Sequence, residues 1–242
     1  MPSKHEQIAG SLIQDILSGR YRVQDRLPSE RDLAARFDAN RGAVREAMKK
    51  LEQIGLADVQ PGGARVKDET EASLDVIGHM LAREALPDPV LVDQILVVVS
   101  SLMSVAAEQT LELASEEEIE RIRALAQPLV HDNLDEAAHT LARFELMRAL
   151  MQASKNLPLQ IISRSLFEQF SPNLGAISQF ADINFSAYAS FARQLDRALE
   201  QRDLPALRSS FEGLSKLNRE TMMRAFDAAR ANPNQLAPGQ EA

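Results

Sequence analysis

Apolar residues recur every three or four positions along most of this 242-residue chain, the spacing that places them on one face of an α-helix. Near the N-terminus this pattern predicts three helices. The first begins around Ile8 and ends near Gly19. The second begins at Ser29, and the third is capped by Asn40 and runs to about Ile54.

A different pattern appears directly after the third predicted helix, in the stretch LADVQPGGARVKD. Two short alternations of apolar and polar residues flank Pro61, Gly62 and Gly63 there, which predicts a β-hairpin with a tight tip. Three helices followed by a hairpin is the element order of a winged helix-turn-helix.

The rest of the chain carries helical periodicity only. An acidic junction, KDETEAS, follows the hairpin and marks the expected boundary between two domains. Beyond it, apolar spacing and proline or asparagine positions predict helices over residues 74–85, 90–113, 115–128, 135–154, 158–170, 184–201 and 204–231.

The predicted fold class is therefore mainly α. Residues 1–68 are expected to form a winged helix-turn-helix of three helices plus a small β-hairpin wing. Residues 69–232 are expected to form an all-α antiparallel bundle of six to seven helices. Residues 233–242, which are polar and contain proline, are expected to form a flexible tail.

Composition narrows the cellular setting. The chain has no cysteine and no tryptophan, which excludes disulfides and cysteine-ligated metals and suits a reducing cytoplasm. Its N-terminus lacks the basic-then-apolar layout of a signal peptide. The longest strongly apolar run, ILVVVSSLM, is too short to span a bilayer. A cytoplasmic protein with no membrane contact is expected.

The net charge of −8 hides an asymmetry along the chain. Residues 1–67 contain 12 Lys and Arg against 9 Asp and Glu, a net of +3, so the remainder carries −11. A basic unit joined to an acidic one is typical of a two-domain DNA-binding protein. An acidic domain beside a nearly neutral one is the plainer interpretation, so charge adds only modest support.

The strongest functional signal is a set of arginines around the second and third predicted helices. Arg41 and Arg45 lie one turn apart behind the Asn40 cap, where guanidinium groups can match guanine edges in a major groove. Arg31 would lie over the DNA backbone, and the small tip at Gly62 could approach a minor groove. The alternative is that these arginines are ordinary solvated helix charges.

The stretch LPSERDLAARFDANRGAVREAMKKLEQIGL, followed by a wing, resembles the DNA-binding domain of the GntR family of bacterial regulators. The resemblance covers residues 5–67. It implies a homodimer that binds double-stranded operator DNA with an inverted repeat. It also implies that DNA is contacted by Arg31, Arg41 and Arg45. Further contacts to the DNA backbone are implied for Ser29, Asn40 and Gly62. Relatives often carry a polar or basic residue where this chain has Pro61.

The helical region resembles the FadR branch of that family, in segments such as LVDQILVVVSSLM and LMRALMQASKNLP. Many members hold a metal there with one Asp and three His. Alignment places Leu141, Glu145, Ala192 and Leu214 at or near these positions, and only Glu145 could bind a cation. No metal and no cofactor are therefore expected.

The long predicted helix over residues 90–113 is apolar nearly all round, as a central buried helix should be. Where carboxylate-sensing relatives carry an inward arginine, this chain has Ile95 or Val99. An apolar pocket suits an acyl chain, whose burial yields about 0.8 kcal/mol per methylene. The resemblance to fatty-acid regulators within the branch implies a long-chain acyl-CoA as effector. In those regulators an arginine aligns with Val99, and a serine-glycine pair and a tryptophan align with Asn218, Arg219 and Met222.

The candidate effector-binding residues are those expected to form the walls of this pocket or to meet the ligand's polar end. They are Val99, Met103, Phe144, Met147, Met151, Phe167, Tyr188, Arg219 and Met222. Lys216, Arg219 and Arg224 are candidates for the phosphates of a CoA group. Each apolar member has the plainer interpretation of an ordinary core residue.

Three further interpretations remain beside the acyl effector. The chain could respond to a small organic acid, or its helical domain could serve only as a dimer without any ligand. An enzyme is the third, but it is not expected, because the sequence lacks a Ser/His/Asp order, a Gly-rich phosphate loop and paired catalytic carboxylates.

Overall fold

The computed structural model describes residues 3–131 and 134–232, and the predicted tail over residues 233–242 lies outside them. The chain divides into two compact units, an N-terminal unit up to Glu84 and a C-terminal unit from Ala85.

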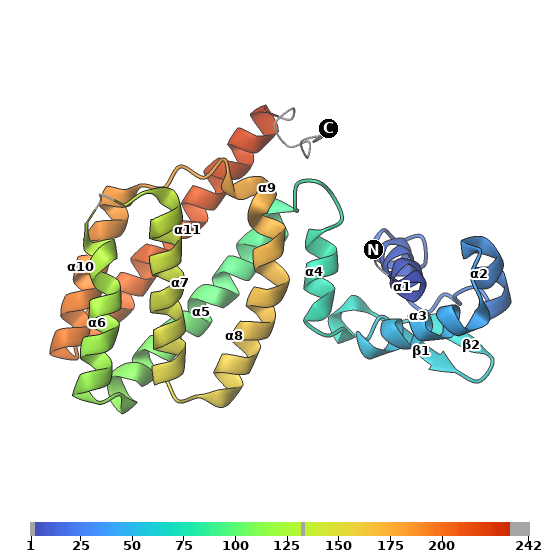
Figure 1. The fold of residues 1–242 in the computed structure, drawn as a ribbon, viewed down its shortest axis with the longest axis horizontal. Helices are drawn as coiled ribbons and strands as arrows, with labels where there is room; N and C mark the ends of the chain where they lie inside the picture. Colours follow the sequence, from blue (N-terminus) through green and yellow to red (C-terminus); the bar gives the residue numbers. More distant parts are fainter. Residues whose placement is uncertain (1–2, 132–133, 233–242) are drawn as a thin grey trace. The chain divides into compact units, whose positions relative to one another are not determined.

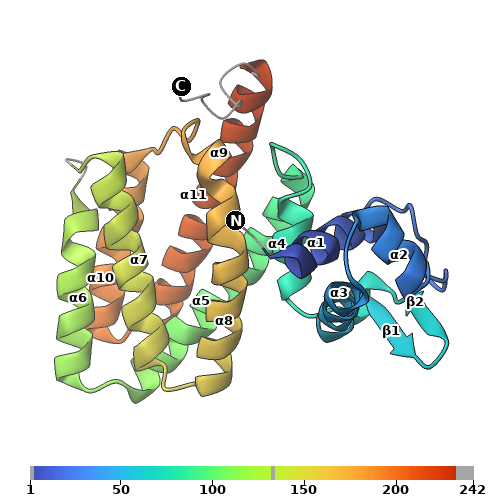
Figure 2. The same cartoon turned by 45° about the vertical axis from the view of Figure 1, so that its right-hand side comes forward.

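The N-terminal unit contains the three predicted helices and the hairpin. Its elements are α1 (Lys4–Leu17), α2 (Glu30–Phe37), α3 (Arg41–Gln53), β1 (Ala57–Gln60), β2 (Gly63–Val66), the 3-10 turn η1 (Glu69–Glu71) and α4 (Asp75–Leu81). The strands pair antiparallel, with Ala57 opposite Val66 and Gln60 opposite Gly63. The hairpin projects beside α3 (Figure 2). The mainly helical fold class and the winged unit are confirmed.

Side-chain caps explain where the two central helices begin. The Ser29 hydroxyl accepts a hydrogen bond from the Asp32 amide, and the Asn40 side-chain Oδ1 accepts one from the Ala43 amide at 2.8 Å. Each cap satisfies an amide that the first helical turn leaves unpaired. Asp38, between the helices, takes a left-handed conformation with φ 46°. These local features fix the turn of the helix-turn-helix.

An ion-pair cluster around Asp15 joins α1 to α2. Its carboxylate lies 2.7 Å from an Arg36 guanidinium nitrogen and 3.2 Å from one of Arg20. Beneath this cluster, residues such as Ile8, Leu12 and Leu51 are fully buried in the core of the unit. The orientation of α2 is therefore held both by apolar packing and by paired charge.

Helix α4 belongs to this N-terminal unit, whereas the sequence suggested a domain boundary at residues 68–69. Val76 is buried in the same core as α1, and the Gln14 side-chain amide lies 3.5 Å from the His79 carbonyl oxygen. The acidic junction is a short 3-10 turn, capped by Asp68, that leads from the wing into α4. The division between compact units follows α4 rather than preceding it.

The C-terminal unit is built from helices throughout its described residues. They are α5 (Pro89–Leu113), α6 (Glu116–Val130), α7 (Glu136–Ala153), α8 (Leu157–Phe170), the 3-10 turn η2 (Ser171–Leu174), α9 (Gly175–Ser178), α10 (Phe185–Gln201) and α11 (Leu204–Ala231). The sequence did not predict the single turn α9. Helix α6 also continues past Pro128, the residue at which it was expected to end.

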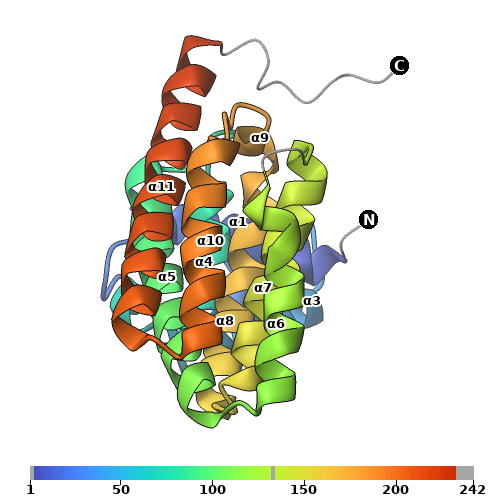
Figure 3. The same cartoon turned by 90° about the vertical axis from the view of Figure 1, so that its left-hand side faces the viewer.

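The helices of this unit pack as neighbours around one apolar core. Helix α6 lies between α7 and α10, α11 runs beside α10, and α5 passes behind α7 and α8 (Figures 1 and 3). Helices α10 and α11 approach each other closely at Gly213. A Cβ atom added there would lie 2.1 Å from the Phe191 ring. Glycine at this position lets the ring pack against the backbone of α11.

Helix α5 is less enclosed than the sequence predicted. Val97 and Val98 are 42% and 48% exposed, and Val105 is also exposed, because α7, α8 and α11 cover only part of the helix. With an 18-residue window of mean hydropathy 2.1, α5 is the one described helix long and apolar enough to cross a membrane. A core helix of a soluble protein can have the same length and composition, so this property does not distinguish a membrane-spanning helix from a core helix.

Candidate DNA-binding surface and effector cavity

The N-terminal end of α3 presents two exposed arginines. Arg41 is the first residue of the helix, directly after the Asn40 cap, and Arg45 follows one turn later. The opposite face of α3 carries the buried residues Val44, Met48 and Leu51. Burial of that face leaves the arginine face exposed, and the helix dipole adds positive potential at the same end.

Arg45 is held by the preceding helix. Its Nε lies 3.0 and 2.9 Å from the two carboxylate oxygens of Glu30, the first residue of α2. The hydrogen bonds and charge of Glu30 raise the pKa of the Arg45 guanidinium. Both side chains are exposed, with Arg45 at 63%, so the pair orients the arginine while leaving it open to a larger ligand.

The predicted residues of α2 have different local surroundings. Arg31 points into solvent with only a loose 3.7 Å approach to Asp32. Ser29 caps the helix, and its hydroxyl also donates to the Asp32 carboxylate at 2.6 Å, which lowers the pKa of Asp32. Ser29 therefore shapes the start of α2, while Arg31 remains available for a phosphate.

The wing tip is small and exposed. Gly62 and Gly63 have φ values of +106° and +142°, and no atom lies within 4 Å of a Cβ built on either. This backbone conformation favours glycine, and the absence of side chains allows close approach to another molecule. All six predicted DNA-contacting residues thus lie in the N-terminal unit, in the helix-turn-helix and at the wing tip.

A cavity of about 660 Å³ lies in the C-terminal unit between α5, α7 and α8. Six of the nine predicted effector-binding residues line it, namely Val99 and Met103 from α5, Phe144, Met147 and Met151 from α7, and Phe167 from α8. Leu102 and Leu141 extend the apolar wall, and charged or amide side chains such as Glu145, Arg148, Gln152 and Arg164 supply the polar lining.

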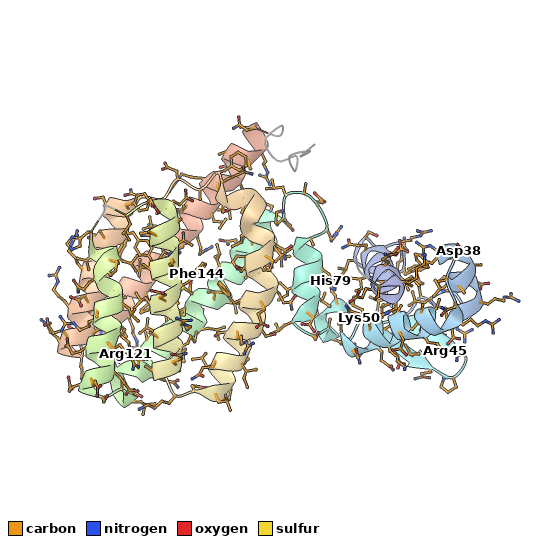
Figure 4. The ribbon with its side chains drawn as sticks, in the orientation of Figure 1. Asp38, Arg45, Lys50, His79, Arg121 and Phe144 are labelled. Carbon is orange, nitrogen blue, oxygen red and sulfur yellow. The ribbon has the colours of Figure 1, made fainter. Side chains whose placement is uncertain are left out.

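Two aromatic rings bridge α7 and α8 across this cavity. The Phe144 and Phe167 rings meet edge to face with centroids 5.1 Å apart, and Figure 4 shows Phe144 on the side of α7 that faces α8. The Ser163 hydroxyl, also in the lining, is buried and has no hydrogen-bond partner. The cavity is thus an apolar slot with one unsatisfied hydroxyl and a charged rim.

The other three predicted effector residues do not line this cavity. Arg219 on α11 forms a bidentate ion pair with Asp93 on α5, at 2.6 and 2.7 Å, which lowers the pKa of Asp93. Met222 lies half-buried one turn further along α11, and Tyr188 is buried on α10. Arg219 ties two helices together, so it is not free to hold a CoA phosphate in this structure.

Tyr188 belongs instead to a polar cluster in the interior of the bundle. His139 on α7 is 1% exposed, and its ring packs edge to face on Tyr188 and Phe185 at 4.6 and 5.0 Å. Arg143, one turn along α7, donates to the Asn218 side-chain oxygen at 2.9 Å and lies 5.0 Å from the Tyr188 ring.

The electrostatics of this cluster are unusual for a protein interior. Burial, reinforced by the positive charge of Arg143, lowers the pKa of His139 to about 4. Neither ring nitrogen of His139 has a hydrogen-bond partner. Arg143 is not among the predicted effector residues, because an inward arginine was expected on α5 only. The signal was its position one turn after His139, beside the core positions Ala142 and Leu146.

The four positions aligned with metal ligands do not come together as a site. Leu141 is exposed, Glu145 lines the cavity, and Ala192 and Leu214 are buried among apolar residues. Within residues 3–131 and 134–232 there is no group of three or more His, Asp or Glu arranged to hold a metal ion.

Comparison with known families identifies the N-terminal unit. Residues 4–66 match the family described as bacterial regulatory proteins, gntR family. This match ends at the second strand of the wing, so it covers the helix-turn-helix and the hairpin and does not extend into the C-terminal unit. The GntR-type resemblance of this unit is confirmed.

Two curated relatives and one solved structure extend the comparison. The uncharacterized HTH-type transcriptional regulator Rv0494 of Mycobacterium tuberculosis is 28% identical over 66% of this chain and 65% of its own length. The HTH-type transcriptional regulator LutR of Bacillus subtilis is 30% identical over 58% of this chain and 64% of its length. The chain thus spans slightly less than two thirds of these relatives. The solved structure of Lar, described as controlling the expression of the Listeria monocytogenes agr system, is 16% identical to this chain. The match covers 94% of this chain and 98% of Lar with a TM-score of 0.56. This likeness supports the fold alone.

Proposed function

We propose that this chain, whose residues 4–66 form a gntR-family DNA-binding domain, is a ligand-responsive bacterial transcriptional regulator. In this proposal it acts in the cytoplasm as a homodimer on an inverted-repeat operator. The observation that carries the proposal is the exposed pair Arg41 and Arg45 at the capped N-terminal end of α3. A helix end of this kind suits insertion into a major groove, with arginine reading guanine.

The six predicted residues divide into two roles in this proposal. Arg41 and Arg45 read base edges, while Arg31, the α2 end at Ser29, the Asn40 cap and the wing tip at Gly62 approach the sugar-phosphate backbone. Phosphate contacts set the position on the duplex, and base contacts give the sequence preference. The local net charge of +3 supports attraction to the duplex despite the acidic remainder of the chain.

DNA binding is tested with the purified full chain and the DNA immediately upstream of its gene. Fluorescence anisotropy should give specific binding that Arg45→Ala weakens by about tenfold or more, because one bidentate base contact is worth roughly 1–3 kcal/mol. Arg121→Ala, at an exposed position on α6, is the matched control and should bind like the wild type. Equal binding by both variants would contradict the role of Arg45.

The proposed effector is a long-chain fatty acyl group, with acyl-CoA as the form delivered to the protein and fatty-acid metabolism as the regulated process. The cavity between α5, α7 and α8 supports this choice because its volume lies in the range of ligand pockets and its walls are apolar. Met103, Met147 and Met151 give these walls an adaptable surface. The expected response is release of DNA as ligand binding changes the relative arrangement of the two DNA-binding units of a dimer.

The effector proposal is tested by native mass spectrometry with oleoyl-CoA, in the presence and absence of DNA. Val99→Phe should fill the cavity and abolish oleoyl-CoA addition. Val105→Phe makes the same change on an exposed position of α5 and should retain it. A dimer that binds DNA but adds no oleoyl-CoA would keep the regulator proposal and reject the acyl effector.

A further inference from the structure

The wing sheet carries two arginines directly opposite each other. The segment that precedes α2 pairs with β2 through an antiparallel bridge between Arg26 and Arg65. Backbone hydrogen bonds of 2.9 and 3.0 Å flank this bridge on both sides. Arg26 and Arg65 therefore form a non-hydrogen-bonded pair, the kind in which opposing side chains share one face of the sheet and lie closest together.

Neither member of this pair is neutralised by an acidic side chain. Among the described residues neither Arg26 nor Arg65 forms an ion pair, and both are exposed. The Arg65 guanidinium donates to the backbone oxygen of Gln24 at 2.8 Å, which is a neutral acceptor. Other arginines of the N-terminal unit do pair with carboxylates, such as Arg20, Arg36 and Arg45.

The two carboxylates next to the pair in the sheet have other hydrogen-bond donors. Asp58 lies opposite Arg65 on β1, and its carboxylate accepts from the Gln60 side-chain amide at 2.8 Å. The Asp25 carboxylate, next to Arg26 in the chain, accepts from a backbone amide at 2.8 Å. Like charges directly opposite each other on a sheet are destabilising. A bound anion would compensate this pair.

The arginine pair lies between two parts of the unit that are proposed to approach the DNA backbone. Arg26 lies three residues before Ser29, the cap of α2, and Arg65 lies two residues after Gly63 of the wing tip. The residue after Arg26 donates its backbone amide to the residue before Arg65 at 2.9 Å. The pair is therefore next to both the start of α2 and the wing tip.

We propose that Arg26 and Arg65 together bind one phosphate of the DNA backbone, outside the bases assigned to α3. This inference rests on the proposed function, because it requires that the N-terminal unit binds duplex DNA. Two guanidinium groups can donate to different oxygens of the same phosphodiester, and the phosphate removes the repulsion between them. Such a contact strengthens binding to every sequence and gives no sequence preference.

The contact is tested by fluorescence anisotropy with the full chain, a random-sequence duplex and the DNA upstream of the gene. The double variant Arg26→Ala with Arg65→Ala should bind both duplexes about tenfold or more weakly. The slope of log K against log salt should fall by about 0.9, as expected for the loss of one phosphate contact. Arg121→Ala, which removes an exposed arginine of α6, should bind like the wild type. Equal binding by the double variant would overturn the proposal.

Arg45→Ala separates this proposal from that of base reading by α3. It should lose the preference for upstream DNA and retain binding to the random duplex, whereas the double variant should lose affinity for both. A wild type that binds upstream and random DNA equally would count against the operator alone, because the comparison on random DNA still tests the arginine pair. A wild type that binds neither duplex would reject both proposals.

Arg26→Glu tests the pair in the absence of DNA. It places a carboxylate opposite Arg65, so an attractive cross-strand pair replaces a repulsive one. The melting temperature should be unchanged or higher, while DNA binding should be weaker than in Arg26→Ala. A lower melting temperature with no further loss of DNA binding would show that Arg26 serves the fold, contrary to the proposal.

Inorganic phosphate distinguishes a DNA contact from a site for a free anion. Melting temperatures are measured with sodium phosphate at an ionic strength held constant with sodium chloride. Saturable stabilisation of the wild type by phosphate, together with unchanged DNA binding by the double variant, would assign Arg26 and Arg65 to a free anion and overturn the DNA contact.

Discussion

Arg45 of α3 is oriented by Glu30 of α2, through two contacts of 2.9 and 3.0 Å to the same Nε atom. In the proposed DNA complex, the pair would fix the arginine before DNA arrives and so reduce the conformational entropy lost on binding. It would also place a carboxylate next to a surface that has to approach phosphates. We therefore expect Glu30 to have two opposing effects on DNA binding, one through the direction of Arg45 and one through the local charge.

These two effects separate in the variant Glu30→Gln. Loss of the negative charge should raise affinity for non-specific DNA, while loss of the ion pair frees Arg45 and should reduce discrimination between operator and random sequence. Anisotropy titrations against operator DNA and random-sequence DNA give the ratio of the two affinities. Because the pair is exposed, the melting temperature should hardly change. A variant that discriminates as well as the wild type would show that Glu30 does not position Arg45.

Arg31 is expected to contact phosphate only. Its side chain is 81% exposed and lies at the start of α2, apart from the α3 residues assigned to base edges. Arg31→Ala should weaken binding to all sequences by a similar factor and reduce the slope of log K against log salt by roughly 0.9. Titrations at several salt concentrations provide the slope. Unchanged slope with lost sequence preference would assign Arg31 to the bases instead.

The helix-turn-helix could be predicted from the sequence because its determinants are local. Ser29 and Asn40 cap helices within three residues of themselves, and Gly62 and Gly63 form the tip of the hairpin they were expected to form. The end of this unit was harder to predict, because it depends on whether Val76 of α4 packs against α1, a contact between residues far apart in the chain.

The predicted effector residues come from five helices, so the sequence could not show which of them lie together. Val99, Phe144 and Phe167 share one cavity, since α5, α7 and α8 are neighbours, but Tyr188 lies on α10 and faces the interior cluster. Periodicity gives the face of each helix and does not give the neighbour that the face meets. The partner of Arg219 could not be inferred either, because Asp93 lies 126 residues away in the sequence.

Gly55, which follows the C-cap residue Ile54 of α3, is expected to be intolerant of any side chain. Its φ is +79°, and a Cβ there would lie 2.9 Å from the Glu71 carbonyl oxygen and 3.0 Å from the Ala72 Cα. Gly19 has nearly the same φ, +78°, with no atom within 4 Å of its Cβ position. Gly19→Ala should therefore cost only the conformational strain, roughly 1–2 kcal/mol, and Gly55→Ala clearly more. Urea unfolding of both variants gives the two losses of unfolding free energy, and their difference measures the clash at Gly55. Equal losses for Gly19→Ala and Gly55→Ala would contradict the expected clash.

The stability of the C-terminal unit should depend on pH through His139. Its pKa is about 4 in the folded chain, because burial between Phe185 and Tyr188 and the charge of Arg143 disfavour the cation, whereas an unfolded histidine titrates near 6.5. The unfolded state therefore binds more protons between these values, and stability falls as the pH falls.

This contribution is fully present above pH 6.5, and about 2 kcal/mol of it should be lost at pH 5. His139→Phe keeps an aromatic ring in contact with Phe185 and Tyr188 and cannot ionise. The wild type's advantage in free energy of unfolding over this variant should therefore shrink or reverse as the pH is lowered. Urea unfolding at pH 7.5 and pH 5 measures this difference. Carboxylates elsewhere in the chain titrate equally in both proteins and cancel in the comparison. A constant difference across this pH range would mean that His139 is protonated in the fold, and that an acceptor reaches its ring.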